Sequence, residues 1–198
     1  QKQYQLVKEN IDAINIKCHD LKHQIRNLRT TGQVDPAYLD DLEKSVSIYN
    51  SAVRTGNETL DIVLTDKRLH CATHEIQFTC IADGGGIAFM ETIDIFSLFG
   101  NILDNAIECE SNLPPDTRFI HLSVRTVNRM LTIHVEHHFE DSLQFRDGLP
   151  VTTKADKDSH GYGMMSVRHI VEKYNGSFSI STQDKLFQID IVMPIPEK

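Results

Sequence analysis

The stretch FGNILDNAIE, residues 99–108, lies within a strongly apolar segment that runs from residue 93 to residue 108. Apolar side chains cover most of the helical surface of this segment, which is typical of a buried helix. Asn101 and Asn105 interrupt that surface four residues apart, so their amides share one helical face. A buried amide is costly unless it is hydrogen-bonded, and neutral oxygens suit a Mg²⁺ ion that also holds phosphate and water. This face is therefore a candidate ligand site.

The spacing alone leaves a second interpretation open, in which the two asparagines cap local structure or face solvent. Asp104 and Glu108 repeat the four-residue spacing beside them and add two carboxylates to this part of the helix.

Short segments of alternating hydrophobicity flank this helix and predict β-strands. A glycine triplet, residues 84–86, is expected to be an ordinary turn, because no Gly-Lys-Ser/Thr of a phosphate loop follows it. A further helix is predicted over residues 162–174. Antiparallel strands with helices on one face predict an α+β sandwich. The predicted strands cover residues 76–80, 119–127, 130–136, 177–181 and 186–193.

The first 57 residues follow a different pattern. Apolar side chains alternate in steps of three and four, the a/d seam of a coiled coil, at Tyr4, Val7, Ile11, Ile14, Cys18, Leu21, Ile25 and Leu28. Thr31-Gly32 is expected to end this helix. Asp35-Pro36 is expected to begin a second helix, whose seam runs from Leu39 to Val53 and which ends at Gly56-Asn57.

Two seams joined by a short loop predict an antiparallel helical hairpin. The hairpin can stand alone or pair with a second copy, and we expect a dimeric four-helix bundle because one hairpin of this length has a thin core.

His19 follows the seam residue Cys18, so its side chain is expected to point to solvent. An isolated His-Asp pair is most simply a charged helix surface. It is also the arrangement of a nucleophilic imidazole beside Asp20, a carboxylate that can hold the ring tautomer and accept a proton.

Residues 152–163 combine Thr153 and Lys154 with Gly161-Tyr162-Gly163 directly before a predicted helix. Glycines let backbone N–H groups approach an anion, a helix N-terminus favours negative charge, and the lysine can reach a terminal phosphate. A Gly-x-Gly before a helix is also common in simple turns.

The composition excludes several classes of protein. The formal net charge of −8 argues against a nucleic-acid binder with a generally basic surface. No run of about 18 apolar residues is present, and the four scattered cysteines favour reduced thiols over a disulfide frame or a structural zinc site. The chain begins without Met or a signal peptide. We expect a cytoplasmic fragment of a longer chain that makes no membrane contact of its own.

Together these segments resemble the cytoplasmic part of sensor histidine kinases, and more narrowly the quorum-type, peptide-sensing kinases with an ATP-binding domain of the GHKL (Bergerat) type. The segments that carry the resemblance are CHDLKHQI (18–25), TGNETLDIVLTDK (55–67), FGNILDNAIE (99–108), DGLPVTTKADKDSHGYGMMSV (147–167) and KYNG (173–176). The resemblance implies a dimerisation and phosphotransfer hairpin, residues 1–57, and an ATP-binding domain, residues 58–198.

The resemblance also implies roles for single residues of the hairpin and the asparagine helix. His19 is similar to the phosphoacceptor and Asp20 to the acid that assists it, while Gln24 matches the glutamine linked to dephosphorylation of the partner protein. Asn105 is expected to bind Mg²⁺, and Asn101 to support the phosphates of ATP.

The remaining matches concern the phosphates and the adenine base. The lid and glycine box are expected to fold over the phosphates, at Thr153, Lys154, Gly161, Tyr162 and Gly163. His137 occupies the position where relatives carry an Asp, or in quorum-type kinases an Asn, that binds the adenine amino group. A zinc site formed by His137 and His138 with His121 and His134 is not expected, because strand periodicity separates their directions.

The implied function is ATP-dependent autophosphorylation of His19 in a homodimer, with phosphotransfer to an Asp of a response regulator. The full-length family carries a membrane sensor. A degenerate dimeric scaffold with weak or no ATP binding is the alternative, motivated by His137. A GHKL ATPase without phosphohistidine is a third possibility, against which the His-Asp hairpin argues.

Overall fold

The computed structural model describes residues 2–31, 34–49, 53–139, 145–146, 149–150 and 162–197. The helices are α1 (Lys2–Thr31), α2 (Pro36–Tyr49), α3 (Glu58–Thr73), α4 (Thr92–Ser111) and α5 (Tyr162–Lys173). The strands are β1 (Gln77–Ala82), β2 (Phe119–Val127), β3 (Met130–His138), β4 (Phe145–Arg146), β5 (Leu149–Pro150), β6 (Ser177–Gln183) and β7 (Leu186–Pro194). Short 3₁₀ turns lie at Gly84–Ile87 and Pro115–Thr117.

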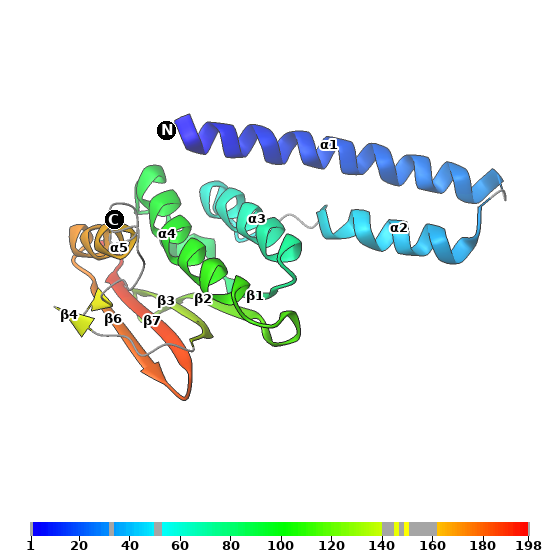
Figure 1. Ribbon diagram of the computed structural model, residues 1–198. Helices are drawn as coiled ribbons and strands as arrows, with labels where there is room; N and C mark the ends of the chain where they lie inside the picture. The colour runs from blue at the N-terminus through cyan, green and yellow to red at the C-terminus, as the bar shows by residue number, and fades with distance from the viewer. Residues whose placement is uncertain are drawn as a thin grey trace.

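The C-terminal part is a five-stranded sheet in the order β1-β2-β3-β7-β6 with helices on one face. Figure 1 shows α3, α4 and α5 side by side over the sheet. The sequence predicts antiparallel strands throughout, and this is wrong for one pair: β1 lies parallel to β2. The reason is that α4 forms a crossover between them, and such a connection returns the chain in the same direction. The α+β sandwich is confirmed.

Side-chain alternation sets the face of each strand. Along β2 and β3 the buried residues alternate with half-buried or exposed ones, and the buried set contacts α4.

The β2–β3 turn, Asn128-Arg129, has φ values of 49° and 63°, as a type I′ hairpin turn requires. The glycine triplet forms a 3₁₀ turn capped by Asp83, as expected for an ordinary turn.

The N-terminal part is a helical hairpin in which α2 packs against α1. Asp35 caps α2 by accepting a hydrogen bond from the Ala37 N–H at 3.0 Å, as predicted. The prediction that α2 extends to Val53 and Gly56 is wrong, because α2 ends at Tyr49 and Val53 instead packs on the core of the sandwich. Asn57 is the N-cap of α3.

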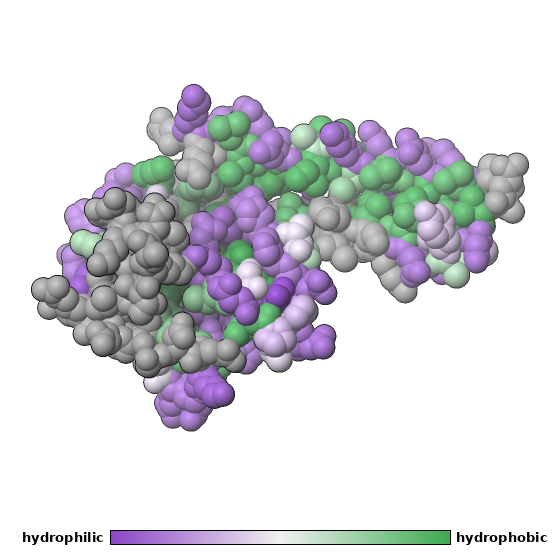
Figure 2. All heavy atoms as spheres, viewed as in Figure 1, coloured by the Kyte–Doolittle hydropathy of each residue, from purple (hydrophilic) through white to green (hydrophobic). Residues whose placement is uncertain are grey.

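The seam of α1 divides into two rows. The a-position residues Ile11, Cys18 and Ile25 are buried, whereas the d-position residues Leu21 and Leu28 are 45% and 42% exposed. Figure 2 shows apolar residues along α1 and at its junction with α2. Within one chain, three of the eight predicted seam residues of α1 are therefore buried and two are exposed.

The first turns of α1 also contact the sandwich. The ring of Tyr4 meets the ring of Phe96 on α4 edge-on, with centroids 5.8 Å apart, and Lys8 pairs with Glu58 of α3 at 2.5 Å. Cavities of about 210 and 450 Å³ lie between α1 and α3.

Within the part of the chain that the structure describes, no helix combines the length and the apolar character that a membrane span needs.

Candidate functional site

Helix α4 carries the two asparagines at the edge of its buried face. Its core side is a continuous apolar stripe that includes Phe99, Ile102 and Ala106. Asn101 and Asn105 are half-buried beside this stripe. The Asn101 Nδ2 donates to the Ser97 carbonyl at 2.8 Å, which orients its amide and leaves Oδ1 as an acceptor.

The beginning of α5 lies against this asparagine face. Gly163 is the second residue of α5, and a Cβ atom placed on it would lie 3.4 Å from the Asn101 Oδ1. The two motifs, more than fifty residues apart in the sequence, are thus in contact. The backbone N–H groups at the N-terminus of α5 offer hydrogen-bond donors to an anion, and the Asn101 Oδ1 beside them is an acceptor.

Several predicted site residues cannot be placed in this arrangement. Thr153, Lys154 and Gly161 lie outside the described residues, and Tyr162 begins α5 with a side chain that is not described. Their assignment stays a prediction.

His137 lies on the core-facing side of β3 and is 2% exposed. Its ring stacks on Phe187 with centroids 5.0 Å apart, and Nδ1 lies 2.8 Å from the His138 carbonyl oxygen. Because a carbonyl oxygen only accepts, Nδ1 carries the proton and Nε2 is left as an acceptor. Burial lowers the pKa of His137 from 6.5 to about 4, so the ring is neutral at pH 7.

His19 lies on the solvent side of α1, as the seam predicts. Its side chain is 80% exposed, and its Nδ1 is 3.7 Å from Oδ1 of Asp20. Cys18 beneath it is buried, and Gln24 is exposed on the same helix. The imidazole is therefore accessible to another protein surface and has a carboxylate beside it.

Two buried charges near the asparagine helix are absent from the sequence-based prediction. The first is Glu110, which is fully buried at the end of α4 and accepts hydrogen bonds from the backbone N–H groups of Phe119 and His138 at 3.0 and 2.5 Å. It joins α4 to β2 and β3 beside His137. Its spacing from Ala106 places it on the apolar stripe, and that is the signal by which it could have been found.

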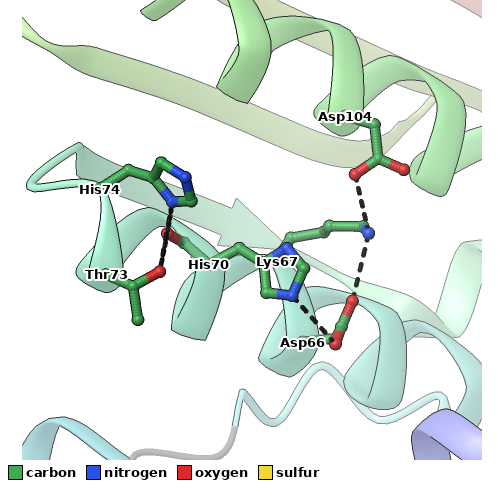
Figure 3. Close-up of polar contacts among 6 residues, drawn as sticks. All are labelled: Asp66, Lys67, His70, Thr73, His74 and Asp104. Carbon is green, nitrogen blue, oxygen red and sulfur yellow. Dashed lines mark hydrogen bonds and ion pairs between the residues drawn. The ribbon is translucent and has the colours of Figure 1, made fainter. Parts of the chain in front are cut away.

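The second buried charge is Lys67 on α3, whose Nζ lies 2.9 Å from Oδ1 of Asp104 and 3.1 Å from Oδ2 of Asp66. Figure 3 shows Lys67 reaching from α3 to Asp104 on α4. Burial lowers the pKa of this lysine, but the two carboxylates outweigh it and the pKa is raised. Asp104 therefore pairs with α3, and Lys67 could have been found by its position on the buried stripe of α3.

The histidines of β2 and β3 do not assemble a zinc site. His121 and His134 share the outer face of the sheet with rings 6.4 Å apart, while His137 lies on the opposite face. His134 Nδ1 pairs instead with Asp190 at 2.8 Å. Among the described residues, no three His, Cys, Asp or Glu side chains are grouped closely enough to hold a metal ion.

Comparisons with known proteins identify the family to which the C-terminal part is similar. Residues 90–194 match the GHKL domain. A probable C4-dicarboxylate sensor kinase from Halalkalibacterium halodurans is 22% identical over 186 residues, covering 87% of this chain but 35% of that protein. The chain thus spans a minor part of that relative.

Solved structures share the fold. A nucleotide-free catalytic domain of histidine kinase ThkA superposes with a TM-score of 0.53 at 17% identity, covering 72% of this chain and 93% of that one. A second nucleotide-free form of the same domain gives a TM-score of 0.53 at 14% identity, covering 70% and 92%. With more than half of its residues matched, this chain belongs to the GHKL domain family.

Proposed function

We propose that this chain is the cytoplasmic part of a membrane-anchored sensor histidine kinase. In this proposal residues 58–198 bind ATP with Mg²⁺, and residues 1–57 present His19 as the phosphoacceptor. The observation that carries it is the contact of Asn101 with the N-terminal turn of α5, combined with an exposed histidine on a separate helical hairpin. The family membership and the named relatives support the same assignment.

The described residues fit such a nucleotide. A Gly at residue 163 keeps the space beside the Asn101 Oδ1 free of a side chain, and the N-terminus of α5 suits phosphate. The amide oxygen of Asn105 is a ligand that Mg²⁺ accepts, and the ion would neutralise phosphate charge. The neutral His137 has an acceptor, Nε2, and an acceptor is what the adenine amino group requires.

The chemistry at His19 follows from its surroundings. Asp20 lies next to Nδ1, so a small rotation lets it hold the proton there and leaves Nε2 to attack phosphorus. A P–N bond forms as the bond between the γ-phosphorus and the bridging oxygen breaks, and ADP departs with that electron pair. The imidazolium proton passes to Asp20 or to water. Positioning and charge neutralisation supply most of the rate.

The placement of α1 constrains how transfer occurs. Tyr4 contacts α4, and His19 lies fifteen residues further along α1, about 22 Å at 1.5 Å per residue. Transfer therefore requires either release of the Tyr4–Phe96 contact or delivery to His19 of a paired subunit. We propose a homodimer that joins through the exposed d-position residues Leu21 and Leu28.

Onward transfer completes the proposal. The phosphoryl group passes from His19 to an Asp of a response regulator, and Gln24 assists dephosphorylation of that partner. The lid residues Thr153, Lys154, Gly161 and Tyr162 close over the phosphates. The quorum-type subfamily remains part of this proposal.

The decisive experiment is incubation with γ-labelled ATP and Mg²⁺. We expect acid-labile, alkali-stable label on the wild-type protein and none on His19→Gln, because His19 lies on the hairpin, is 80% exposed and has a carboxylate directly beside it. The matched control is His23→Gln, an exposed histidine one turn further along α1, which should label normally.

Each alternative has its own outcome in this experiment. Equal label on His19→Gln contradicts the phosphoacceptor assignment. Absence of both label and nucleotide binding supports the scaffold alternative, and phosphate release that is independent of His19 supports an ATPase.

A further inference from the structure

Lys67 is a charged residue in a buried position, and its burial is energetically costly. The residue is 8% exposed, and an ammonium group at such a position loses its hydration. Replacement of a buried ion pair by apolar side chains is often neutral or stabilising, so stability alone is a poor explanation for the lysine. A buried pair does, however, hold two elements in one relative orientation.

The partner of Lys67 lies at the level of the candidate nucleotide site. Asp104 occupies the position directly before Asn105 and three residues after Asn101 on α4. Successive residues on a helix are rotated by about 100°, so fixing the direction of Asp104 fixes the direction of Asn105. The ion pair with Lys67 turns Asp104 toward α3 (Figure 3).

Two further polar contacts hold α4 near its ends: Glu110 holds its last turn against β2 and β3, and Asp94 holds its first turn. Asp94, in the first turn of α4, accepts hydrogen bonds from Lys173 Nζ and the Tyr174 hydroxyl, each at 2.7 Å. That tether holds the beginning of the helix, about two turns before Asn101. The Lys67–Asp104 pair is the polar contact of described residues that acts between the two asparagines.

We propose that Lys67 is a positioning residue: through Asp104 it sets the rotation of α4 at which Asn105 faces Mg²⁺ and the phosphates. Lys67 does not touch the nucleotide in this proposal. The inference rests on the proposed nucleotide site and adds a residue from α3, outside the segment matched by the GHKL family.

The test is a double-mutant cycle of Lys67→Met, Asp104→Asn and the combined variant. ADP affinity is measured by calorimetry with Mg²⁺ and with EDTA, and the thermal midpoint is recorded for each protein. Met keeps the length of the lysine stem, and Asp104 is 60% exposed, so both substitutions leave the packing largely intact.

We expect each single variant to bind Mg·ADP about tenfold more weakly, the lower end of the effect of residues that orient a metal ligand. In EDTA, the affinity of each variant for ADP should stay close to the affinity of the wild-type protein for ADP in EDTA. The combined variant should lose no more than either single variant, because both residues act through one contact. Arg129→Met, which breaks the surface pair with Glu197, is the control and should leave affinity unchanged.

The outcomes separate this inference from the proposed function. A wild-type protein that binds no Mg·ADP refutes the nucleotide site itself. If the wild type binds but the variants match it, the positioning role is wrong. Losses that are additive, that are equal in Mg²⁺ and EDTA, or that parallel a fall in thermal midpoint also overturn it, because these are the marks of a general structural role.

Discussion

His137 is the residue in which burial and chemistry are most tightly linked. Its ring is enclosed between the sheet and the helices, stacks on Phe187, and uses its one proton on the His138 carbonyl. In the proposed nucleotide site, the free Nε2 of this neutral ring would be the acceptor for the adenine amino group.

The lowered pKa of His137 predicts a pH dependence of stability. The unfolded ring binds a proton below about pH 6.5, whereas the folded ring stays neutral down to about pH 4. The neutral ring therefore contributes fully to the free energy of unfolding above about pH 6.5. This contribution falls as the pH drops toward 4, by about 2 kcal/mol between pH 7.5 and pH 5. Urea unfolding at these two pH values measures it. In His137→Phe this contribution should disappear, and an unchanged pH dependence would show that the ring is not buried as a neutral group.

Helix α4 is the element that connects the structural core to the site. One face carries the apolar stripe, Glu110 ties its end to β2 and β3, Lys67 holds its middle, and the asparagines lie at the remaining edge. At this edge the N-terminal turn of α5 lies against Asn101.

The close contact between α5 and α4 predicts how Gly163 tolerates substitution. A Cβ atom there makes an ordinary contact with the Asn101 Oδ1 at 3.4 Å, so Gly163→Ala should bind nucleotide nearly as the wild type does. The two methyl groups of Gly163→Val would enter the space beside Asn101, and we expect Mg·ADP affinity to fall about tenfold or more. Helix propensity changes by less than about 1 kcal/mol, so the thermal midpoint should move little. Calorimetric affinities that are equal for Val and Ala would contradict a nucleotide between the two helices.

The molecule as a whole is a helical hairpin, with part of its apolar seam exposed, joined to a sandwich that has its own buried core. Three of the four a-position residues of α1 are buried within one chain, whereas the d-position residues Leu21 and Leu28 are exposed. Exposed apolar residues at heptad spacing are typical of a hairpin that packs against a second copy of itself in a four-helix bundle.

The exposed row predicts a dimer that one charge can disrupt. Leu21→Asp should yield monomers by light scattering, because a carboxylate in the bundle interior would lose its hydration. Ile16→Asp is the matched control: Ile16 is 64% exposed but lies off the seam, so this variant should remain dimeric. A dimeric Leu21→Asp protein would refute the interface.

Local chemistry in the sequence was sufficient to predict most elements of the fold. Helix and strand periodicities and the Asp35 cap depend on near neighbours in the chain. The exposure of His19 followed from its place beside the seam residue Cys18 for the same reason.

Contacts between distant segments were beyond that kind of prediction. The parallel β1–β2 pair, the packing of Val53 on the sandwich, the pairing of Asp104 with Lys67 and the meeting of Asn101 with Gly163 each depend on which elements become neighbours. A periodic pattern reports which face of an element is buried, but not what that face is buried against. The positions of Lys67 and Glu110 on apolar stripes indicate that they are buried, but their partners depend on three-dimensional packing and are known only from the folded chain.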